Sequence, residues 1–176
     1  MSPEQWRAVL LKMEPGGKPW ILDGLADAMP VMVERFGINT PFRQQHFLAT
    51  CAHESDHFRT TEEYASGGNY ENRRDLGNTH PGDGRRFKGR GLIQLTGRAN
   101  YDAASKALGE PYVDDPALVL RFPAAAIVSG WFWQTHGLNE LADKDDHRPV
   151  CKRVNGGYNG LDSRLALLKT AKSVIA

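Results

Sequence analysis

Apolar residues recur at helical spacing along much of this 176-residue chain. Near the N-terminus, that spacing predicts a short amphipathic helix whose apolar positions are Trp6, Val9, Leu10 and Met13. Ser2 and Pro3 precede these positions and Gln5 lies three residues after the serine, which is the arrangement of an N-cap, a first-turn proline and a capping box. We therefore expect a helix that begins close to the first residue.

Two further helical patterns follow. The first covers Leu22–Phe36, where Pro30 predicts a kink or an interruption and Gly37 closes the pattern. The second begins at Thr40-Pro41, a pair typical of a helix start. One stripe of this helix carries Phe47, Leu48, Cys51, Ala52 and Ser55. The stripe predicts that one face of the helix packs in the core.

The middle of the chain has a different composition. Between Gly67 and Gly91, glycine, asparagine, aspartate, arginine and proline dominate and little periodicity remains. Such a segment is typical of an irregular or short-hairpin region exposed to solvent, where functional groups often lie. The apolar residues of 92–95 predict a short strand or an extended piece that ends before Gly97.

Helical spacing returns in the last part of the chain. It predicts a helix that ends at Gly109, one capped by Asp115-Pro116, an apolar one from Pro123 to near Gly137, and one over Leu161–Ile175. The apolar helix contains Trp131 and Trp133, which favours core packing of both over a platform for sugar stacking. The predicted fold class is therefore mainly α, with a small irregular or β-hairpin element in the middle.

Length and composition add limits on the organisation and the partners. No repeat or low-complexity linker divides the chain, so residues 1–176 are expected to form a single domain. The net charge of +1 excludes a strong global field, and we expect a monomer without a nucleic-acid partner. Cys51 and Cys151 are expected to be reduced core cysteines.

The chain shows neither a signal peptide nor a membrane span. Its start lacks a basic segment followed by an apolar one, and no stretch approaches the roughly 18 uncharged apolar residues of a span. We expect synthesis in the cytoplasm and no stable membrane association.

Six cations crowd the middle of the chain: Arg73, Arg74, Arg85, Arg86, Lys88 and Arg90. Such a group is able to attract an anionic polymer. It is equally consistent with a solvated loop. The sequence leaves both interpretations open.

A short motif at 53–57, His-Glu-Ser-Asp-His, matches the H-E-x-x-H pattern of zinc peptidases. There, two histidines one helical turn apart bind zinc and the glutamate activates a water molecule. A third ligand is needed, but the position six residues after the second histidine is Glu63, and nothing in the spacing singles out Glu71 or Asp75. A zinc peptidase stays an alternative, and we expect no metal.

The preferred interpretation makes Glu54 and Glu63 the two carboxylates of glycoside hydrolysis, one protonating the leaving oxygen and the other activating water or acting as the nucleophile. On one helix, nine residues rotate by about 900° and rise by roughly 13.5 Å, which would leave the two side chains on opposite faces. The helix must therefore end between them, and Arg59–Thr61 is a plausible place. Glu54 borders the apolar stripe, where partial desolvation would keep it protonated, whereas Glu63 lies in a polar stretch.

Three sequence blocks, in this order, resemble glycoside hydrolases of family nineteen, and most closely the single-domain bacteriophage endolysins that cut peptidoglycan. They are AHESDHFRTTEEYAS (Ala52 to Ser66), FKGRGLIQLTGRANY (Phe87 to Tyr101) and KRVNGGYNG (Lys152 to Gly160). FGINTPFRQQHFLA (Phe36 to Ala49) and GWFWQTHGLNELAD (Gly130 to Asp143) also fit. The resemblance implies that residues 1–176 form a single catalytic glycoside hydrolase domain, which is lysozyme-like, chitinase-like and helical, without a separate wall-binding domain.

The resemblance also implies roles for individual residues. The second carboxylate is Glu63 and not Glu62, because the family pattern places it directly before the Tyr-x-Ser seen at 64–66. The Thr96 hydroxyl, often a serine in the family, would help to hold the attacking water. The implied substrate contacts are Tyr64, Gln94, Asn100 and Asn155. Arg164 would orient the catalytic carboxylates, although a plain helix-surface charge is also consistent with its sequence context.

The resulting expectation is an endolysin that hydrolyses the β-1,4 bonds of bacterial peptidoglycan glycan strands by an inverting mechanism, without a cofactor. The resemblance to phage lysis systems implies that the protein reaches the wall from the host cytoplasm after a separate protein permeabilises the membrane. The nearest alternative is a chitinase acting on an uncharged polymer. A zinc metallopeptidase and a non-catalytic glycan-binding module are the alternatives of other classes.

Overall fold

The computed structural model describes residues 1–176, which form nine α-helices and three short 3-10 helices without a named strand. The α-helices are α1 (Pro3–Met13), α2 (Pro19–Arg35), α3 (Pro41–Glu54), α4 (Asp83–Arg86), α5 (Arg98–Leu108), α6 (Ala124–Thr135), α7 (Leu138–Ala142), α8 (His147–Asn155) and α9 (Leu161–Val174). The 3-10 helices are η1 (Gly68–Tyr70), η2 (Arg74–Leu76) and η3 (Pro116–Leu120). The mainly α prediction is confirmed.

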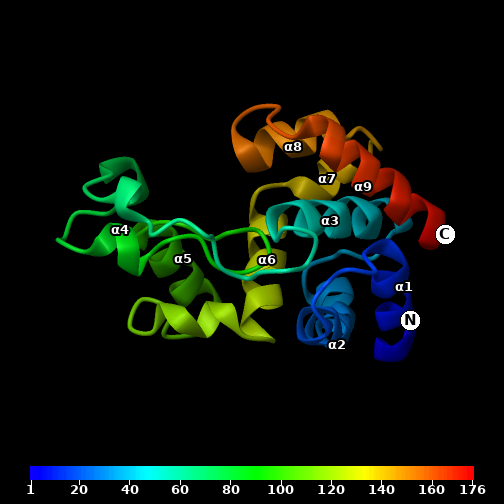
Figure 1. Cartoon of the computed structure of the whole chain (residues 1–176), viewed down its shortest axis with the longest axis horizontal. Coiled ribbons are helices and arrows are strands. Elements are labelled where there is room, and N and C mark those ends of the chain that lie inside the picture. Colours follow the sequence, from blue (N-terminus) through cyan, green and yellow to red (C-terminus); the bar gives the residue numbers. More distant parts are fainter.

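The chain forms a helical body and a smaller lobe (Figure 1). The body contains α1 to α3 and α6 to α9, and both termini lie at its far end from the lobe. The lobe contains the chain from η1 to η3, including α4 and α5. Within the body, α3 packs against α9, α8 and α7, so its C-terminal end is surrounded by chain from the last third of the sequence.

Local sequence signals fix several helix ends. The Ser2 side chain accepts a hydrogen bond from the backbone N–H of Gln5 at 3.3 Å, and the Gln5 side chain accepts one from the backbone of Ser2 at 2.8 Å, which is the predicted capping box. Gly109 ends α5 in the left-handed conformation, as expected. The interruption predicted at Pro30 is absent, because α2 continues through it. The proline faces solvent while Met29 and Met32, on either side of it, are fully buried and hold the helix in place.

The expected strand at 92–95 is also absent. Residues 91–94 form a turn in which Gln94 has a φ of 60°, and the hairpin element reduces to two isolated bridges, Glu62 with Arg90 and Arg90 with Leu95. Leu92, Ile93 and Leu95 are nevertheless buried. Their apolar character therefore reflects tertiary packing of a turn. In so short a run, the apolar pattern of a buried turn cannot be distinguished from that of a strand.

Three helices, α4, α7 and α8, were not predicted from the sequence. The α8 segment is polar and contains Pro149, so it has few apolar positions. It begins at Asp146, whose side chain accepts a hydrogen bond from the backbone N–H of Arg148 at 3.0 Å. That N-cap was the available signal.

The hydrophobic core has two parts. A large cluster of 29 buried residues lies in the body, and a cluster of 7 lies in the lobe. Helix α6 joins them, because Trp133 is buried in the first cluster and Val128 in the second, while Trp131 packs against both. The core role predicted for the two tryptophans is thus confirmed. Cys51 and Cys151 are free and buried, as expected.

None of the helices combines the length and the apolar character that a membrane crossing requires.

Candidate active site

The end of α3 places Glu54, which is the last residue of that helix. The following Ser55 caps the helix: its hydroxyl donates to the Cys51 carbonyl at 2.6 Å and accepts from the backbone N–H of Phe58 at 3.2 Å. Asp56, His57 and Phe58 then have positive φ angles of 49°, 58° and 58°, and the buried Phe58 side chain anchors this unusual turn. The helix therefore ends between the two glutamates, as required, but earlier than the expected Arg59–Thr61.

This turn removes the geometry of a zinc-peptidase motif. His57 lies outside α3, so the two histidines are not one helical turn apart on a common face. The His53 Nδ1 lies 3.2 Å from the Ser163 hydroxyl, whereas the His57 Nδ1 lies 3.1 Å from a carboxylate oxygen of Glu14. No three histidine, cysteine, aspartate or glutamate side chains are grouped so that they could hold a metal ion.

Glu54 is held by Arg164 of α9. The Nη2 of Arg164 donates a hydrogen bond to the Oε1 of Glu54. The Arg164 side chain is only 2% exposed, and the Glu54 side chain is 20% exposed. Arg164 is therefore a buried cation at the first candidate carboxylate, and the plain surface charge that its sequence also allowed is wrong.

Glu63 lies against the middle of the chain, where its backbone N–H donates to the Gly89 carbonyl at 3.0 Å. The Tyr70 hydroxyl donates to the Glu63 Oε2 at 2.9 Å, while the Glu63 Oε1 is buried without a protein partner. Burial, together with this bond to Glu63, raises the pKa of Tyr70, which therefore stays a donor. Nothing in the sequence singled out Tyr70, because η1 has no periodic signal.

Three candidate residues, Glu63, Gln94 and Thr96, converge around Gly89. A Cβ atom at this glycine would lie 2.8 Å from the Gln94 Oε1, 3.1 Å from the Glu63 Oε2 and 3.3 Å from the Thr96 Oγ1. Three polar oxygens therefore face the same stretch of backbone, which only glycine leaves open to them. Glycine at this position therefore leaves room for the three side chains that meet there.

Hydrogen bonds to the backbone orient this group. The Gln94 amide donates to the Gly91 carbonyl at 2.8 Å, which leaves its oxygen turned toward Gly89. The Thr96 hydroxyl donates to the Gln94 carbonyl at 2.9 Å, so its oxygen remains free to accept. Asn100, in the first turn of α5, donates to the Thr96 carbonyl at 2.7 Å.

The neighbouring Glu62 is engaged elsewhere. One of its carboxylate oxygens lies 3.2 Å from the Lys88 Nζ and 3.3 Å from the Arg90 Nε. The two adjacent glutamates thus contact different groups. This arrangement agrees with the choice of Glu63 over Glu62.

Two expected substrate contacts lie apart from these residues. Tyr64 is 78% exposed, and its hydroxyl donates to the Asp56 carboxylate at 2.8 Å. Asn155, the last residue of α8, donates to the Asn159 carbonyl at 3.4 Å. Neither makes a hydrogen bond to Glu54 or Glu63, so both are available at the surface.

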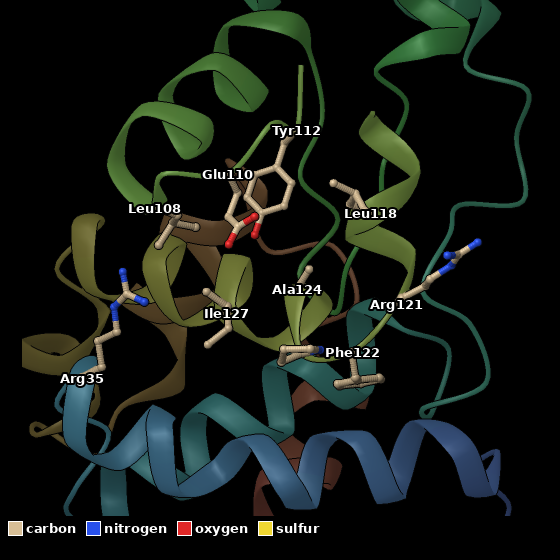
Figure 2. A pocket seen from close by; sticks show the side chains of 10 residues that line it. Arg35, Leu108, Glu110, Tyr112, Leu118, Arg121, Phe122, Ala124 and Ile127 are labelled. Carbon is tan, nitrogen blue, oxygen red and sulfur yellow. The ribbon is translucent and has the colours of Figure 1, made fainter. Parts of the chain in front are cut away.

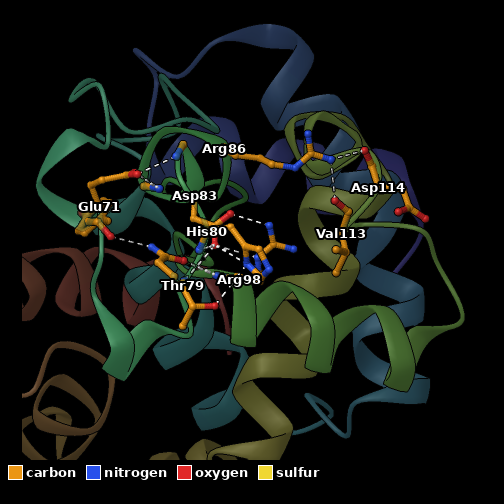
Figure 3. A network of polar contacts seen from close by, with 12 residues as sticks. Glu71, Thr79, His80, Asp83, Arg86, Arg98, Val113 and Asp114 are labelled. Atoms are coloured by element: carbon orange, nitrogen blue, oxygen red, sulfur yellow. Dashed lines mark hydrogen bonds and ion pairs between the residues drawn. The ribbon is translucent and has the colours of Figure 1, made fainter.

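Charged groups brace the lobe that carries Gly89 (Figure 3). The two oxygens of Glu71 accept from the backbone N–H groups of Gly82 at 2.7 Å and Gly84 at 2.9 Å. The buried Asp83 accepts two hydrogen bonds from Arg98, at 2.9 and 2.6 Å. The Arg98 guanidinium lowers the pKa of Asp83 to about 2 despite its burial. The lobe is therefore tied together by ionised groups as well as by its small core.

The family model described as Chitinase class I matches residues 46–158, a segment that contains Glu54, Glu63, Gln94 and Thr96. The chain belongs to glycoside hydrolase family 19.

Two relatives illustrate the range of this family 19 similarity. A glycosyl hydrolase family 19 domain-containing protein of Haemophilus influenzae is 29% identical, over 86% of this chain and 89% of that protein. An endochitinase of Arabidopsis thaliana is 37% identical over 62% of this chain, and the match spans only 38% of the plant protein.

Solved family 19 structures share the fold. Chitinase C from Streptomyces griseus superposes with a TM-score of 0.77 at 22% identity, covering 96% of this chain and 90% of that one. A class IV chitinase from Zea mays superposes with a TM-score of 0.70 at 17% identity, covering 98% and 91%. The protein is therefore a chitinase-like glycoside hydrolase with the expected helical fold.

Four of the six cations in the basic segment of this family 19 domain make polar contacts within the protein. Arg73 pairs with Asp75 at 2.5 Å, and Lys88 and Arg90 pair with Glu62. Arg86 donates to two backbone carbonyls, those of Val113 and Asp114, at 3.0 and 2.8 Å (Figure 3). Of the six cations noted in the sequence, Arg74 and Arg85 make no such contact, and both are exposed.

A separate hollow of about 320 Å³ lies beside α6 (Figure 2). Its apolar wall includes Leu108 and Ile127, and the polar ends of Glu110 and Tyr112 lie close together within it. None of the candidate catalytic or sugar-binding residues lines this hollow.

Proposed function

We propose that this family 19 glycoside hydrolase is an endolysin-like muramidase, which cleaves the β-1,4 bonds of bacterial peptidoglycan with inversion. The observation that carries the catalytic part is the pairing of an arginine-bound carboxylate at the end of α3 with a second carboxylate beside Gly89. The choice of peptidoglycan rests on the resemblance of the three sequence blocks to phage endolysins.

In this mechanism Glu54 is the general acid. Its carboxyl proton passes to the glycosidic oxygen as the bond from that oxygen to the anomeric carbon breaks. Negative charge then develops on Glu54, and the buried Arg164 guanidinium stabilises it without reorganisation. Arg164 is thus a positioning and charge-stabilising group for the acid.

Glu63 is the general base. A water molecule near Gly89 would be held by the Thr96 hydroxyl and by Glu63, whose Oε1 has no protein partner. Glu63 takes one proton from this water as the water oxygen bonds to the anomeric carbon on the face opposite the leaving oxygen. Tyr70 fixes the other oxygen of Glu63. No cofactor takes part in these steps.

The sugar contacts are proposed to come from both sides of the site. Gln94 and Asn100 lie beside Thr96 on the lobe, and Asn155 lies at the end of α8 on the body. Tyr64 offers an exposed aromatic ring, a surface on which pyranose rings stack. Arg74 and Arg85 are the exposed cations that could meet the lactyl and peptide carboxylates of the wall polymer.

Cleavage of chitin is the second candidate, and a specific observation favours it: the Arabidopsis relative and the superposed structures carry chitinase names. The same two glutamates would perform the chemistry. The polymers differ in charge, because chitin lacks lactyl groups and acidic peptides.

The two candidates are separated by incubating the protein with purified peptidoglycan and with chitin oligomers. The reducing-end sugar of the products is identified by mass spectrometry, and their anomeric configuration by proton NMR during the first turnovers. We expect muramic acid at the reducing ends of the products from peptidoglycan, formed in the inverted configuration, whereas glucosamine ends would show that the other alternating linkage is cleaved. Rapid cleavage of chitin with inert peptidoglycan would assign the chitinase function instead.

We also propose where the protein acts. The protein would act as a monomer on the cell wall, after a separate protein has permeabilised the membrane. Lysis from outside should therefore require a permeabilised cell, which a turbidity assay on intact and chloroform-treated cells measures directly.

A further inference from the structure

A row of polar side chains runs from the partly exposed Lys172 and Asp145 to the buried His46 and His147, and the proposed mechanism does not use it. The Lys172 Nζ donates to Asp145 at 2.6 Å, and an oxygen of Asp145 lies 3.1 Å from the Nε2 of His46. The Nδ1 of His46 lies 3.0 Å from the Nδ1 of His147. His46 in α3 and His147 in α8 are fully or almost fully buried, with 0% and 1% exposed.

The partners determine where the protons lie. Burial opposes the charge of Asp145, but the hydrogen bonds from Lys172 and His46 outweigh it and lower the pKa of this carboxyl. An ionised carboxylate only accepts, so the His46 Nε2 must carry a proton. Burial lowers the pKa of His46, which is then neutral, and its Nδ1 has only a lone pair. The short contact between the rings therefore requires a proton on the His147 Nδ1.

This assignment leaves the His147 Nε2 as an acceptor. Burial lowers the pKa of His147 to about 3, and His46 and Arg164 act in the same direction, so the ring stays neutral near physiological pH. The Nε2 is buried without a protein partner. The same is true of two Arg164 nitrogens, Nε and Nη1, both of which can only donate.

The unmet groups are complementary. The acceptor, the His147 Nε2, lies on α8, and the donors, the Arg164 Nε and Nη1, lie on α9. These two helices pack together, and both residues are almost fully buried. Leaving such buried groups without partners is energetically costly, so a shared hydrogen bond is strongly favoured. A water molecule with two or more polar neighbours is a common bridge in such a place.

We propose that His147 is a positioning residue for the Arg164–Glu54 pair: its Nε2 accepts a hydrogen bond from Arg164, directly or through one buried water molecule. The bond fixes the guanidinium, which then holds Glu54 in the geometry needed for proton donation. Asp145 and His46 set the orientation of the His147 ring. The catalytic consequence rests on the proposed role of Glu54.

Two amide substitutions of His147 test the proposal, because they are expected to differ in their effect on kcat. In His147→Gln, the amide oxygen reaches about as far as the histidine Nε2 and can accept a hydrogen bond from Arg164. In His147→Asn, the shorter amide reaches only the position of the Nδ1, so it preserves the contact with His46 but not the one with Arg164. We expect His147→Asn to lower kcat at least about ten-fold with KM within about two-fold, and His147→Gln to keep kcat within about three-fold of the parent.

A control separates positioning from stability. Val150→Ala in the same helix removes buried apolar atoms without touching the polar row, and it should lower the melting temperature with kcat unchanged. Equal kcat losses in the two His147 variants, or a loss that follows melting temperature across all three, would overturn the proposal.

Nitrogen NMR of the labelled parent protein supplies a readout that does not depend on hydrolysis. The His147 Nε2 should be unprotonated and hydrogen-bonded near neutral pH, and the Arg164 Nε–H should exchange slowly with solvent. A proton on the His147 Nε2 would contradict the proposal. Failure of the parent protein to cleave either polymer would instead refute the proposed function and leave this NMR test in force.

Discussion

The two candidate carboxylates are held by different physical means. Glu54 ends a helix that packs within the 29-residue apolar cluster of the body, and the buried Arg164 binds it. Glu63 lies beside a lobe whose apolar cluster has only 7 residues and whose shape depends on Glu71, Asp83 and Arg98. The body is therefore stabilised mainly by apolar burial and the lobe to a larger degree by ionised side chains.

This difference has a consequence for function. Apolar burial depends little on pH, whereas ion pairs are lost when their carboxylates become protonated. The lobe should therefore lose stability as pH falls toward 2, where the Asp83 carboxylate that Arg98 binds becomes protonated. Substitutions in the lobe and in the body should likewise have different signatures, and the predictions below separate them.

The largest expected effect is at Glu63. Glu63→Gln removes the base and should lower the rate of hydrolysis by at least about 100-fold, because general acid–base catalysis typically contributes 10²–10⁴-fold. Glu62→Gln is the matched control: it loses ion pairs with Lys88 and Arg90 at a partly exposed position and should cost little activity. Initial rates on the cleaved polymer give the ranking, and the reverse order would place the base at Glu62.

Gly89→Ala should have the next largest effect. The new methyl group would meet the Gln94 oxygen at 2.8 Å and the Glu63 oxygen at 3.1 Å, so these groups must move. We expect a loss of about ten-fold or more in kcat. Gly16→Ala is the control, because its methyl group would meet nothing nearer than the flexible end of Arg59 at 3.4 Å. Full activity of Gly89→Ala would show that this convergence has no catalytic role.

Asp83→Asn should weaken the lobe by about 2 kcal/mol, the linkage value of a carboxyl whose pKa falls from 3.8 to about 2 on folding. A depressed pKa means that the stabilisation is fully present above about pH 4 and is lost as pH falls toward 2. Urea unfolding of parent and variant at neutral and acid pH measures this. The difference between them should shrink in acid, and a constant difference would contradict the ion-pair explanation.

The smallest expected effect concerns the exposed cations. Arg74 and Arg85 are the two of the six basic residues in the middle that make no ion pair or hydrogen bond within the protein, so they are the freest to meet an anionic polymer. The double substitution Arg74→Gln with Arg85→Gln should lower activity on peptidoglycan a few-fold at low salt and little at high salt, since exposed charges are screened beyond about 8–10 Å. A salt series on peptidoglycan and chitin oligomers tests this, and identical losses on both polymers would exclude a role for charge.

Local signals in the sequence predicted much of the body. The helix starts at Ser2 and Thr40 in the body and the helix end at Gly109 in the lobe depend on neighbours within a few residues, so they were predicted correctly. Residues 92–95 were not, because a buried turn and a short strand share the same apolar run. Helix α8 was missed because it has few apolar positions among polar residues.

The candidate site likewise has a part that the sequence predicted and a part that it did not. Glu54 and Glu63 could be selected because they lie in one motif, and the requirement that the helix end between them followed from helix geometry. The convergence on Gly89 depends on a turn with a positive φ at Gln94, which no spacing predicts. The contact of His46 with His147 joins residues 101 positions apart, and only the fold brings them together.

The most direct test of the central claim is the rate of hydrolysis by Glu54→Gln, measured on purified peptidoglycan and on chitin oligomers together with the melting temperature. The amide keeps the shape of the side chain but has no acidic proton to donate, so we expect a loss of at least about 100-fold on whichever polymer the parent cleaves. The melting temperature should remain close to that of the parent. Retention of more than about a tenth of the parent rate would contradict the assignment of Glu54 as the general acid.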